Sequence, residues 1–389
     1  MNEQSHAIGR SGRWIVPMRP RSPDEEHRAS TPLELFFDLV FVVAIAQAGS
    51  RLHHAVAAAH VAEGILSYAM VFFAIWWAWM NFTWFASAYD TDDIPYRVAT
   101  LVQITGSLII AAGVPRAFEA HDFSIVIFGY VVMRLALVEQ WLRAARSDPP
   151  RRGCAHRYAL GVSTCQAGWV ALLFAPSDWA MVGFVTLVIA ELLVPAWAER
   201  ACATTWHPGH IAERYGLFTI IVLGESILAA SIAIQSVIQA GDLTSDVTAI
   251  IVGGLLIVFS MWWLYFDHPM EGLLTSLPRA FLWGYGHYAI FAAATAVGAG
   301  LGVAVDHATG HATIGPFGAG AAVAVPVAIY LLGLWLLHLR LEEISSAGAG
   351  LTPLVALLVL LTPWTGQAVL LTGFLVAGLL TVKLVMRYR

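Results

Sequence analysis

The chain has 389 residues, of which 58% are hydrophobic and only 12% are charged, and its formal net charge at pH 7 is −5. Soluble domains carry about 25% charged residues, so a water-facing surface is excluded for most of this chain. The negative charge excludes nucleic acid as a partner. Three cysteines are too few for a disulfide framework, and no paired Cys/His spacing indicates a metal site or another cofactor. The composition predicts an all-α protein whose main partner is the lipid bilayer.

Twelve apolar segments follow a polar, arginine-rich tail over residues 1–30, which has no apolar core of the kind found in a signal peptide. A membrane-spanning helix needs about 20 mostly apolar residues. The eleventh segment is the shortest, and Pro363 separates it from the twelfth, so these two could instead form a re-entrant or tilted hairpin. The predicted spans are 33–50, 64–86, 96–114, 123–143, 156–175, 179–197, 212–236, 247–266, 280–303, 317–338, 350–362 and 365–385.

The basic residues predict the orientation of these spans, because Lys and Arg collect in short cytoplasmic loops. With the N-terminus inside, the outside loops hold only Arg51 and Arg116, and Arg134 lies within the fourth span. Every other Lys or Arg then falls on the cytoplasmic side. The pattern predicts cytoplasmic N- and C-termini and an even number of spans.

The two halves of the chain share a pattern with an offset of about 180 residues. The start of the first span, 34–38, matches the start of the seventh, 213–218, and Trp76-Trp77 matches Trp262-Trp263. Tryptophan and proline also recur near membrane borders without duplication, which is the alternative explanation. We expect two six-helix repeats over 31–200 and 201–389. Six spans per repeat would give both the same orientation, as in transporters built from parallel repeats.

Two segments carry a resemblance to a known family. Thr31–Val42 and His210–Ile227 resemble the two signatures of the bacterial low temperature requirement A family, and length and signature spacing extend the similarity over nearly the whole chain. The resemblance implies a multi-pass protein of the bacterial plasma (inner) membrane. The family is named for a growth phenotype at low temperature, so the resemblance implies no catalytic or ligand-binding residue.

Ionisable residues inside the predicted spans are the candidates for function, because each costs about 2.5–3.5 kcal/mol at a helix centre. Glu34 is explained structurally, since Thr31, Pro32 and Glu34 form a capping box. We predict that the others line a polar cavity shared by the first and seventh helices. These candidates are Asp38, Arg134, Glu139, Glu191, Glu213, Arg214, Glu225 and His287.

The balance of charge within this set indicates what the cavity could handle. Six acids, with Glu34 included, accompany two bases, Arg134 and Arg214. By depth, Glu225 is the partner that we expect for Arg134. Acids left without a base in a low dielectric hold protons or bind cations. The structural alternatives are salt bridges at the membrane rim for Glu213 and Arg214, and a packing role for His287.

These residues predict a proton- or cation-coupled transporter of an unidentified small molecule. The alternative is a membrane protein of stress adaptation or sensing that transports nothing. No GxSxG or HExxH motif, and no pair of histidines four residues apart within a span, indicates an enzyme. The sequence leaves open whether the protein is a homo-oligomer.

Overall fold

The computed structural model describes residues 14–23, 25–26, 28–241, 243–267, 269–339 and 350–387. These residues form twelve α-helices and no β-strand. Ten of the twelve are long and apolar enough to cross a membrane. The helices are α1 (Pro32–Ala57), α2 (Val61–Tyr89), α3 (Ile94–Glu119), α4 (Ser124–Ser147), α5 (Arg152–Leu172), α6 (Ser177–Glu199), α7 (Pro208–Ala240), α8 (Ser245–Phe266), α9 (Leu277–Ala308), α10 (Pro316–Leu334), α12 (Leu351–Val359) and α13 (Ala368–Arg387).

The all-helical, multi-span prediction is therefore confirmed, with two exceptions in detail. Helix α5 is 21 residues long, which is enough to cross, but Arg152, His156 and Arg157 make it less apolar than the other long helices. It packs along both α4 and α6, so it belongs to the bundle. Helix α12 has only nine residues, about 13 Å, and cannot span a bilayer. It turns into α13 through a short 3-10 helix and Gly366, which has a φ of 75°. The predicted full eleventh span is wrong, and the hairpin alternative describes this segment.

Proline and capping residues explain where the helices begin. Proline occupies the first or second position of α1, α3, α7, α9 and α10, where its missing N–H is not needed. The capping box predicted for α1 is present, with the Thr31 side chain accepting from the Glu34 backbone and the Glu34 side chain accepting from Thr31. These starts set the depth at which the polar residues of α1 and α7 enter the bundle.

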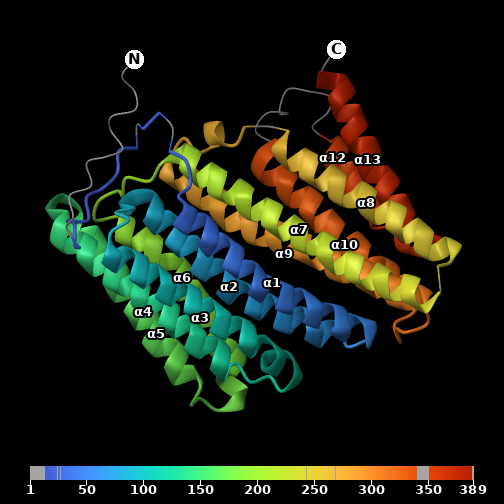
Figure 1. Cartoon of the computed structure of the whole chain (residues 1–389), viewed down its shortest axis with the longest axis horizontal. Helices are drawn as coiled ribbons and strands as arrows, with labels where there is room; N and C mark the ends of the chain where they lie inside the picture. Colours follow the sequence, from blue (N-terminus) through green and yellow to red (C-terminus); the bar gives the residue numbers. More distant parts are fainter. Residues whose placement is uncertain are drawn as a thin grey trace.

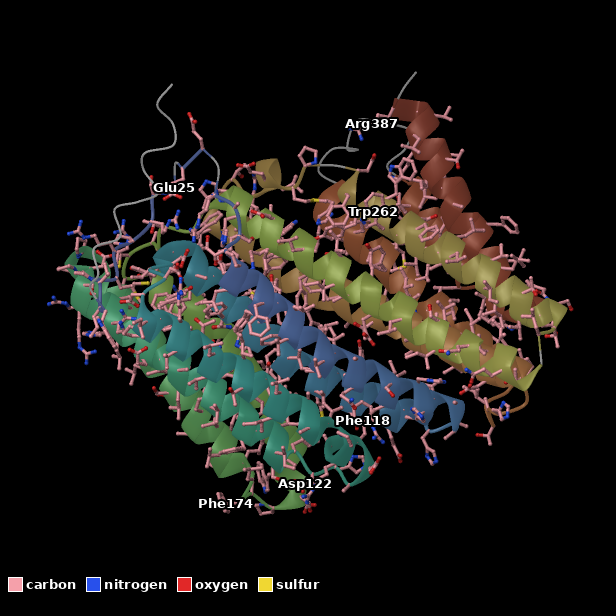
Figure 2. The ribbon with its side chains drawn as sticks, in the orientation of Figure 1. Glu25, Phe118, Asp122, Phe174, Trp262 and Arg387 are labelled. Carbon is pink, nitrogen blue, oxygen red and sulfur yellow. The ribbon has the colours of Figure 1, made fainter. Side chains whose placement is uncertain are left out.

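The bundle has two ends. Figure 2 shows Glu25 and Arg387 at one end, and Asp122 and Phe174 at the opposite end. We call the first the proximal end and the second the distal end. Residues near the start and at the end of the described chain therefore lie at the same end of the bundle.

The helices form two groups that meet along one seam (Figure 1). In the first group α1 packs on α2 and α3, α3 on α4, α4 on α5, and α5 on α6. In the second group α7 packs on α8 and α9, α9 on α10, α10 on α12, and α12 on α13. The seam between the groups consists of α1 and α2 against α7 and α9.

The tryptophans that match between the halves of the sequence have different surroundings. Trp76 and Trp77 are 2% and 0% exposed, and Trp262 and Trp263 are both 46% exposed. The first pair packs inside the bundle, where Trp77 stacks on Phe73, and the second pair lies on its outer surface. Only the first pair is therefore placed to take part in an internal site.

Candidate functional site

The seam between the two groups of helices holds a buried cluster of charges, which we call the seam cluster: Glu34, Asp38, Trp79, His210 and Arg214. The Arg214 guanidinium donates from Nε and Nη2 to the two carboxylate oxygens of Asp38, at 2.9 and 2.5 Å. Its Nη1 donates to Glu34 Oε1 at 3.0 Å. Glu34, Asp38 and Arg214 are each at most 1% exposed, so this arginine ties the first half to the second through two acids.

Helical spacing explains why these residues meet. Glu34 and Asp38 lie four residues apart on α1 and so share one face of that helix. Trp79 of α2 donates from Nε1 to Asp38 Oδ1 at 2.6 Å. His210 lies four residues before Arg214 on α7, with Nε2 3.1 Å from Glu34 Oε1. This contact lacks hydrogen-bond geometry, and within the described chain neither ring nitrogen of His210 has a hydrogen-bond partner.

The seam cluster contains two carboxylates and one guanidinium. Its formal charge is −1 unless one acid or His210 carries a proton. Two neighbouring polar residues, Arg28 and Tyr96, interact electrostatically with Glu34 and so affect the charge balance of the cluster. Arg28 donates to the backbone oxygens of Ser87 and Ala86 at the end of α2, and Tyr96 has a buried hydroxyl without a described partner.

A second buried cluster lies inside the first half, and we call it the bundle cluster. Its centre is Glu191 of α6, which is 0% exposed and accepts from five side chains of α2, α4 and α5. The donors are Trp77 Nε1 at 3.0 Å, the Tyr130 hydroxyl at 3.0 Å, Arg134 Nη2 at 2.7 Å, Gln166 Nε2 at 3.0 Å and Trp169 Nε1 at 3.3 Å. Glu191 is therefore saturated with donors.

Arg134 is less well satisfied than its partner Glu191. It is 1% exposed, and its Nε and Nη1 have no hydrogen-bond partner among the described residues. Its guanidinium carbon lies 5.4 Å from the centre of the Tyr130 ring. Two N–H-bearing nitrogens of a buried cation are thus available to an acceptor.

Helix α2 relates the two clusters to each other. Trp77 donates to the bundle cluster and Trp79 to the seam cluster. Residues two apart on a helix are separated by about 200° of rotation and about 3 Å of rise. The clusters therefore lie on nearly opposite sides of α2 at almost the same depth.

Two pockets flank the bundle cluster along the same helices, one on its distal side and one on its proximal side. The distal pocket has a volume of about 460 Å³, and its walls include Phe73, Phe184, Tyr130 and Trp169. Asp122 lines it too, which places its mouth at the distal end. A small pocket of about 20 Å³ lies on the proximal side. Its lining includes Trp77, Asn81, Trp141, Tyr158 and Pro195.

The remaining predicted residues lie outside both clusters. His287 accepts from the Tyr265 hydroxyl at 3.0 Å and donates to the Trp283 backbone oxygen at 2.7 Å, so its hydrogen-bonding capacity is used. Glu139 is exposed and lies 3.9 Å from Arg143. Neither residue contacts the seam cluster through a hydrogen bond or ion pair within the described chain.

Two further acids of α7 complete the predicted set. Glu213 is half-buried and accepts from the Ser30 backbone at 3.3 Å. Glu225 is half-buried and has no hydrogen bond or ion pair with another described residue. The prediction that Arg134 pairs with Glu225 is wrong, because Arg134 pairs with Glu191. The sequence gives the depth of each residue along its helix, but not which helix faces pack together.

The N-terminal segment forms part of the proximal end, which the sequence did not indicate. Met18 is fully buried, and the Val16 backbone donates to Asp93 at 2.9 Å. Arg21 donates to Asp90 at 3.4 Å, just beyond the end of α2. Burial and the charge of Glu34 raise the pKa of Asp90 to about 6. Arg21 also interacts electrostatically with Glu34, so this segment carries charge that acts on the seam cluster.

The fold and its buried ion pairs define a polytopic α-helical membrane protein. The family model described as bacterial low temperature requirement A protein (LtrA) matches residues 29–387. The chain belongs to this family, and the resemblance found in the two signature segments is confirmed. An uncharacterized protein of Rhizobium meliloti (strain 1021) is 27% identical over 283 residues, covering 68% of this chain and 67% of that protein. No solved structure matches the chain.

Proposed function

We propose that the protein is a secondary transporter, coupled to protons or cations, in which two six-helix halves move against each other. In this proposal the halves are parallel repeats over 31–200 and 201–389, the proximal end faces the cytoplasm, and the membrane is the bacterial inner membrane. The observation that carries the proposal is the seam cluster, in which Arg214 of one half binds Glu34 and Asp38 of the other.

The energetics of buried ions favour a moving contact over a static one. Removing ions from water costs several kcal/mol per ion, and well-packed apolar residues often stabilise a fixed contact equally well or better. When two halves separate, charges at the seam regain water, which lowers the cost of opening. Charges at this position therefore suit a contact that breaks and re-forms.

The composition of the seam cluster supports proton or cation coupling. The neighbouring Arg28 is hydrogen-bonded to backbone oxygens and to neither acid of the cluster among the described contacts. The formal charge of −1 is therefore most easily cancelled by one proton or one bound cation. Asp38 and Arg214 each lie six residues from the first residue of their helices, about 9 Å from the proximal ends of α1 and α7. An opening on that side would expose them to water.

The repeated order of helix neighbours supports the two-repeat part of the proposal. The contacts of α1 with α2 and α3, and of α3 with α4, correspond to those of α7 with α8 and α9, and of α9 with α10. Parallel repeats of this kind place a binding site near their shared axis. The seam of α1 and α2 against α7 and α9 is where that axis would run.

The test measures flux in vesicles of phosphatidylethanolamine and phosphatidylglycerol that contain a pH-sensitive dye. Sodium, potassium, amino acids and small organic acids are added separately under an imposed pH gradient. We expect at least one to drive proton movement in the wild type, and Asp38→Asn to reduce that movement at least about tenfold, because it removes one acid of the seam cluster. Glu139→Gln, which removes an exposed acid of the same half, is the matched control.

The competing candidate is a stress-adaptation or sensory protein that carries nothing. It is favoured by the closed packing of the seam cluster, where Arg214 uses all three nitrogens on described partners. Under this alternative, Asp38→Asn would change thermal stability without changing any flux. If none of the solutes drives proton movement in the wild-type protein, that result would also support this alternative.

A further inference from the structure

The bundle cluster and the distal pocket form one continuous row along four helices. On α2, Phe73 lines the distal pocket, Trp77 contacts Glu191, and Asn81 lines the proximal pocket. These residues are four apart and so share one helix face. The same order holds on the other helices, with Tyr130, Arg134 and Trp141 on α4, Trp169, Gln166 and Tyr158 on α5, and Phe184, Glu191 and Pro195 on α6.

Tyr130 and Trp169 form the floor of the distal pocket and separate it from the ion pair, because neither Arg134 nor Glu191 is among the residues that line the pocket. Tyr130 and Trp169 line the pocket, and both donate to Glu191 Oε1, at 3.0 and 3.3 Å. A side-chain rotation of either residue would open the pocket to Glu191 and Arg134. The pocket, at about 460 Å³, is within the size range of small-molecule sites.

The unused hydrogen-bonding groups of the ion pair behind this floor decide the charge of the ligand. Glu191 already accepts from five donors, so it offers little to a cation. Arg134 has two nitrogens without a described partner, and both can only donate. A ligand that completes the site must therefore carry an acceptor, and guanidinium recognises carboxylate best. The aromatic and aliphatic walls require that the rest of the ligand be apolar.

We propose that the distal pocket binds a small organic acid, with its apolar body against Phe73 and Phe184 and its carboxylate at Arg134. This site lies within the first half and is separate from the seam cluster. The inference rests on the proposed transport only for the step in which the bound acid is carried across. Binding itself requires no movement of the two halves.

The ligand would enter together with a proton. A carboxylate added to the Arg134–Glu191 pair gives three groups with a net charge of −1, and a proton on Glu191 removes the excess. The other titratable groups that face this site are Tyr130 on α4 and Cys165 on α5, with His121 and Asp122 at the mouth. Binding should therefore strengthen as the pH falls, and this dependence should require Glu191.

The experiment compares three probes with the same apolar body in purified protein in detergent. These are 3-phenylpropanoate, 3-phenylpropanamide and 3-phenylpropylamine, and binding is measured by calorimetry and by quenching of tryptophan fluorescence. We expect the carboxylate to bind at least about tenfold more tightly than the amide, because a hydrogen bond to a charged group is stronger than a neutral one, and the amine to bind least. Tightest binding of the amine, or equal binding of all three, or binding of none, overturns the proposal.

Two sets of variants separate binding at Arg134 from a merely structural ion pair. Glu191→Gln should bind 3-phenylpropanoate about tenfold more tightly and lose the pH dependence, because the competing acid is gone. The charge-neutral double variant Arg134→Gln/Glu191→Gln avoids a buried uncompensated charge and should lose at least about tenfold in affinity. An ion pair with only a structural role predicts no change of affinity in either variant.

A pocket-filling variant tests the location of the body of the ligand. Ala180 lines the distal pocket, and Val182 of the same helix does not and is 56% exposed. Ala180→Phe should abolish binding of 3-phenylpropanoate, and Val182→Phe should leave it unchanged. Unchanged binding in Ala180→Phe contradicts the assigned pocket. Binding in detergent without flux in vesicles would refute the transport proposal and leave this site standing.

Discussion

The seam cluster and the bundle cluster are both buried ion pairs beside α2, yet they differ in the balance of their charges. In the seam cluster one arginine has two acids and uses every nitrogen, and its partners come from both halves. In the bundle cluster one acid has five donors, its arginine is left with two unused nitrogens, and all partners come from one half. In our proposals the seam cluster is a contact between moving parts and the bundle cluster is a ligand site, and the difference follows from which partner is left unsatisfied.

The largest effect on stability is expected from removing the shared arginine of the seam cluster. Arg214→Gln leaves Glu34 and Asp38 buried without their shared arginine, which should cost about 3–5 kcal/mol. The double variant Arg214→Gln/Asp38→Asn keeps the formal charge at −1 and should recover much of this loss. Thermal unfolding in detergent measures both. The control is Arg279→Gln, which changes an exposed arginine that donates to the Thr275 hydroxyl. A single variant as stable as the wild type would show that the seam contact is not held by charge.

A smaller effect is expected from the corresponding change in the bundle cluster. Arg134→Gln leaves Glu191 without its cation, but four uncharged donors remain from α2, α4 and α5. We expect a loss of about 2–3 kcal/mol, measured in the same thermal unfolding assay. A loss larger than that of Arg214→Gln would reverse the comparison between the two clusters.

The two tryptophans of α2 sharpen the comparison at the level of single hydrogen bonds. Trp77→Phe and Trp79→Phe each remove one N–H donor to a buried carboxylate, and each should cost about 1.5–3 kcal/mol, part of it from lost packing. Asp38 has no other neutral side-chain donor among the described residues, whereas Glu191 keeps three. Trp79→Phe should therefore lower the unfolding temperature more than Trp77→Phe does. Equal decreases would argue against the idea that Asp38 has fewer donors to spare than Glu191.

The smallest effect is expected at the proximal end, from Asp90. Its pKa is raised to about 6 by burial and by Glu34, above the ordinary value near 4. The folded protein therefore binds the proton more tightly than the unfolded chain, and stability falls as the pH rises from about 4 to 6. Asp90→Asn should stabilise the protein by about 1 kcal/mol at pH 7, less at pH 5, and not at all near pH 4. Unfolding curves at these pH values check the prediction, and destabilisation at pH 7 would show that the contact with Arg21 dominates.

The sequence predicted the helices well because each signal was local. Long apolar runs, the capping box at Thr31 and prolines at helix starts are all contained within one or two turns. Pro363 also indicated that the eleventh segment could be a short helix within a hairpin. The sequence likewise singled out Asp38, Arg134, Glu191 and Arg214, because an ionisable group in an apolar run stands out regardless of its surroundings.

Partners could not be predicted in the same way, because they depend on which helices touch. Depth alone assigned Glu225 to Arg134, whereas the true partner Glu191 comes from α6, which packs against α5. The sequence favoured a capping role for Glu34, and the same side chain also accepts from Arg214. The distal pocket depends on side chains of α2, α4, α5 and α6, and no spacing within one segment reveals it.

The central claim, that the two halves move about the seam during transport, is tested most directly by locking them together. His53 Nε2 of α1 and Asp306 Oδ2 of α9 are hydrogen-bonded across the seam at 2.7 Å. Arg51 of α1 and Glu119 of α3 form an ion pair within the first half. In protein whose three native cysteines are replaced, the pairs His53→Cys/Asp306→Cys and Arg51→Cys/Glu119→Cys are each joined by a short bis-methanethiosulfonate cross-linker, which spans side chains too far apart for a direct disulfide. Solute-driven proton flux is then measured. The account predicts that the first cross-link abolishes flux until it is reduced and that the second leaves flux intact. Full flux with the seam completely cross-linked would contradict it.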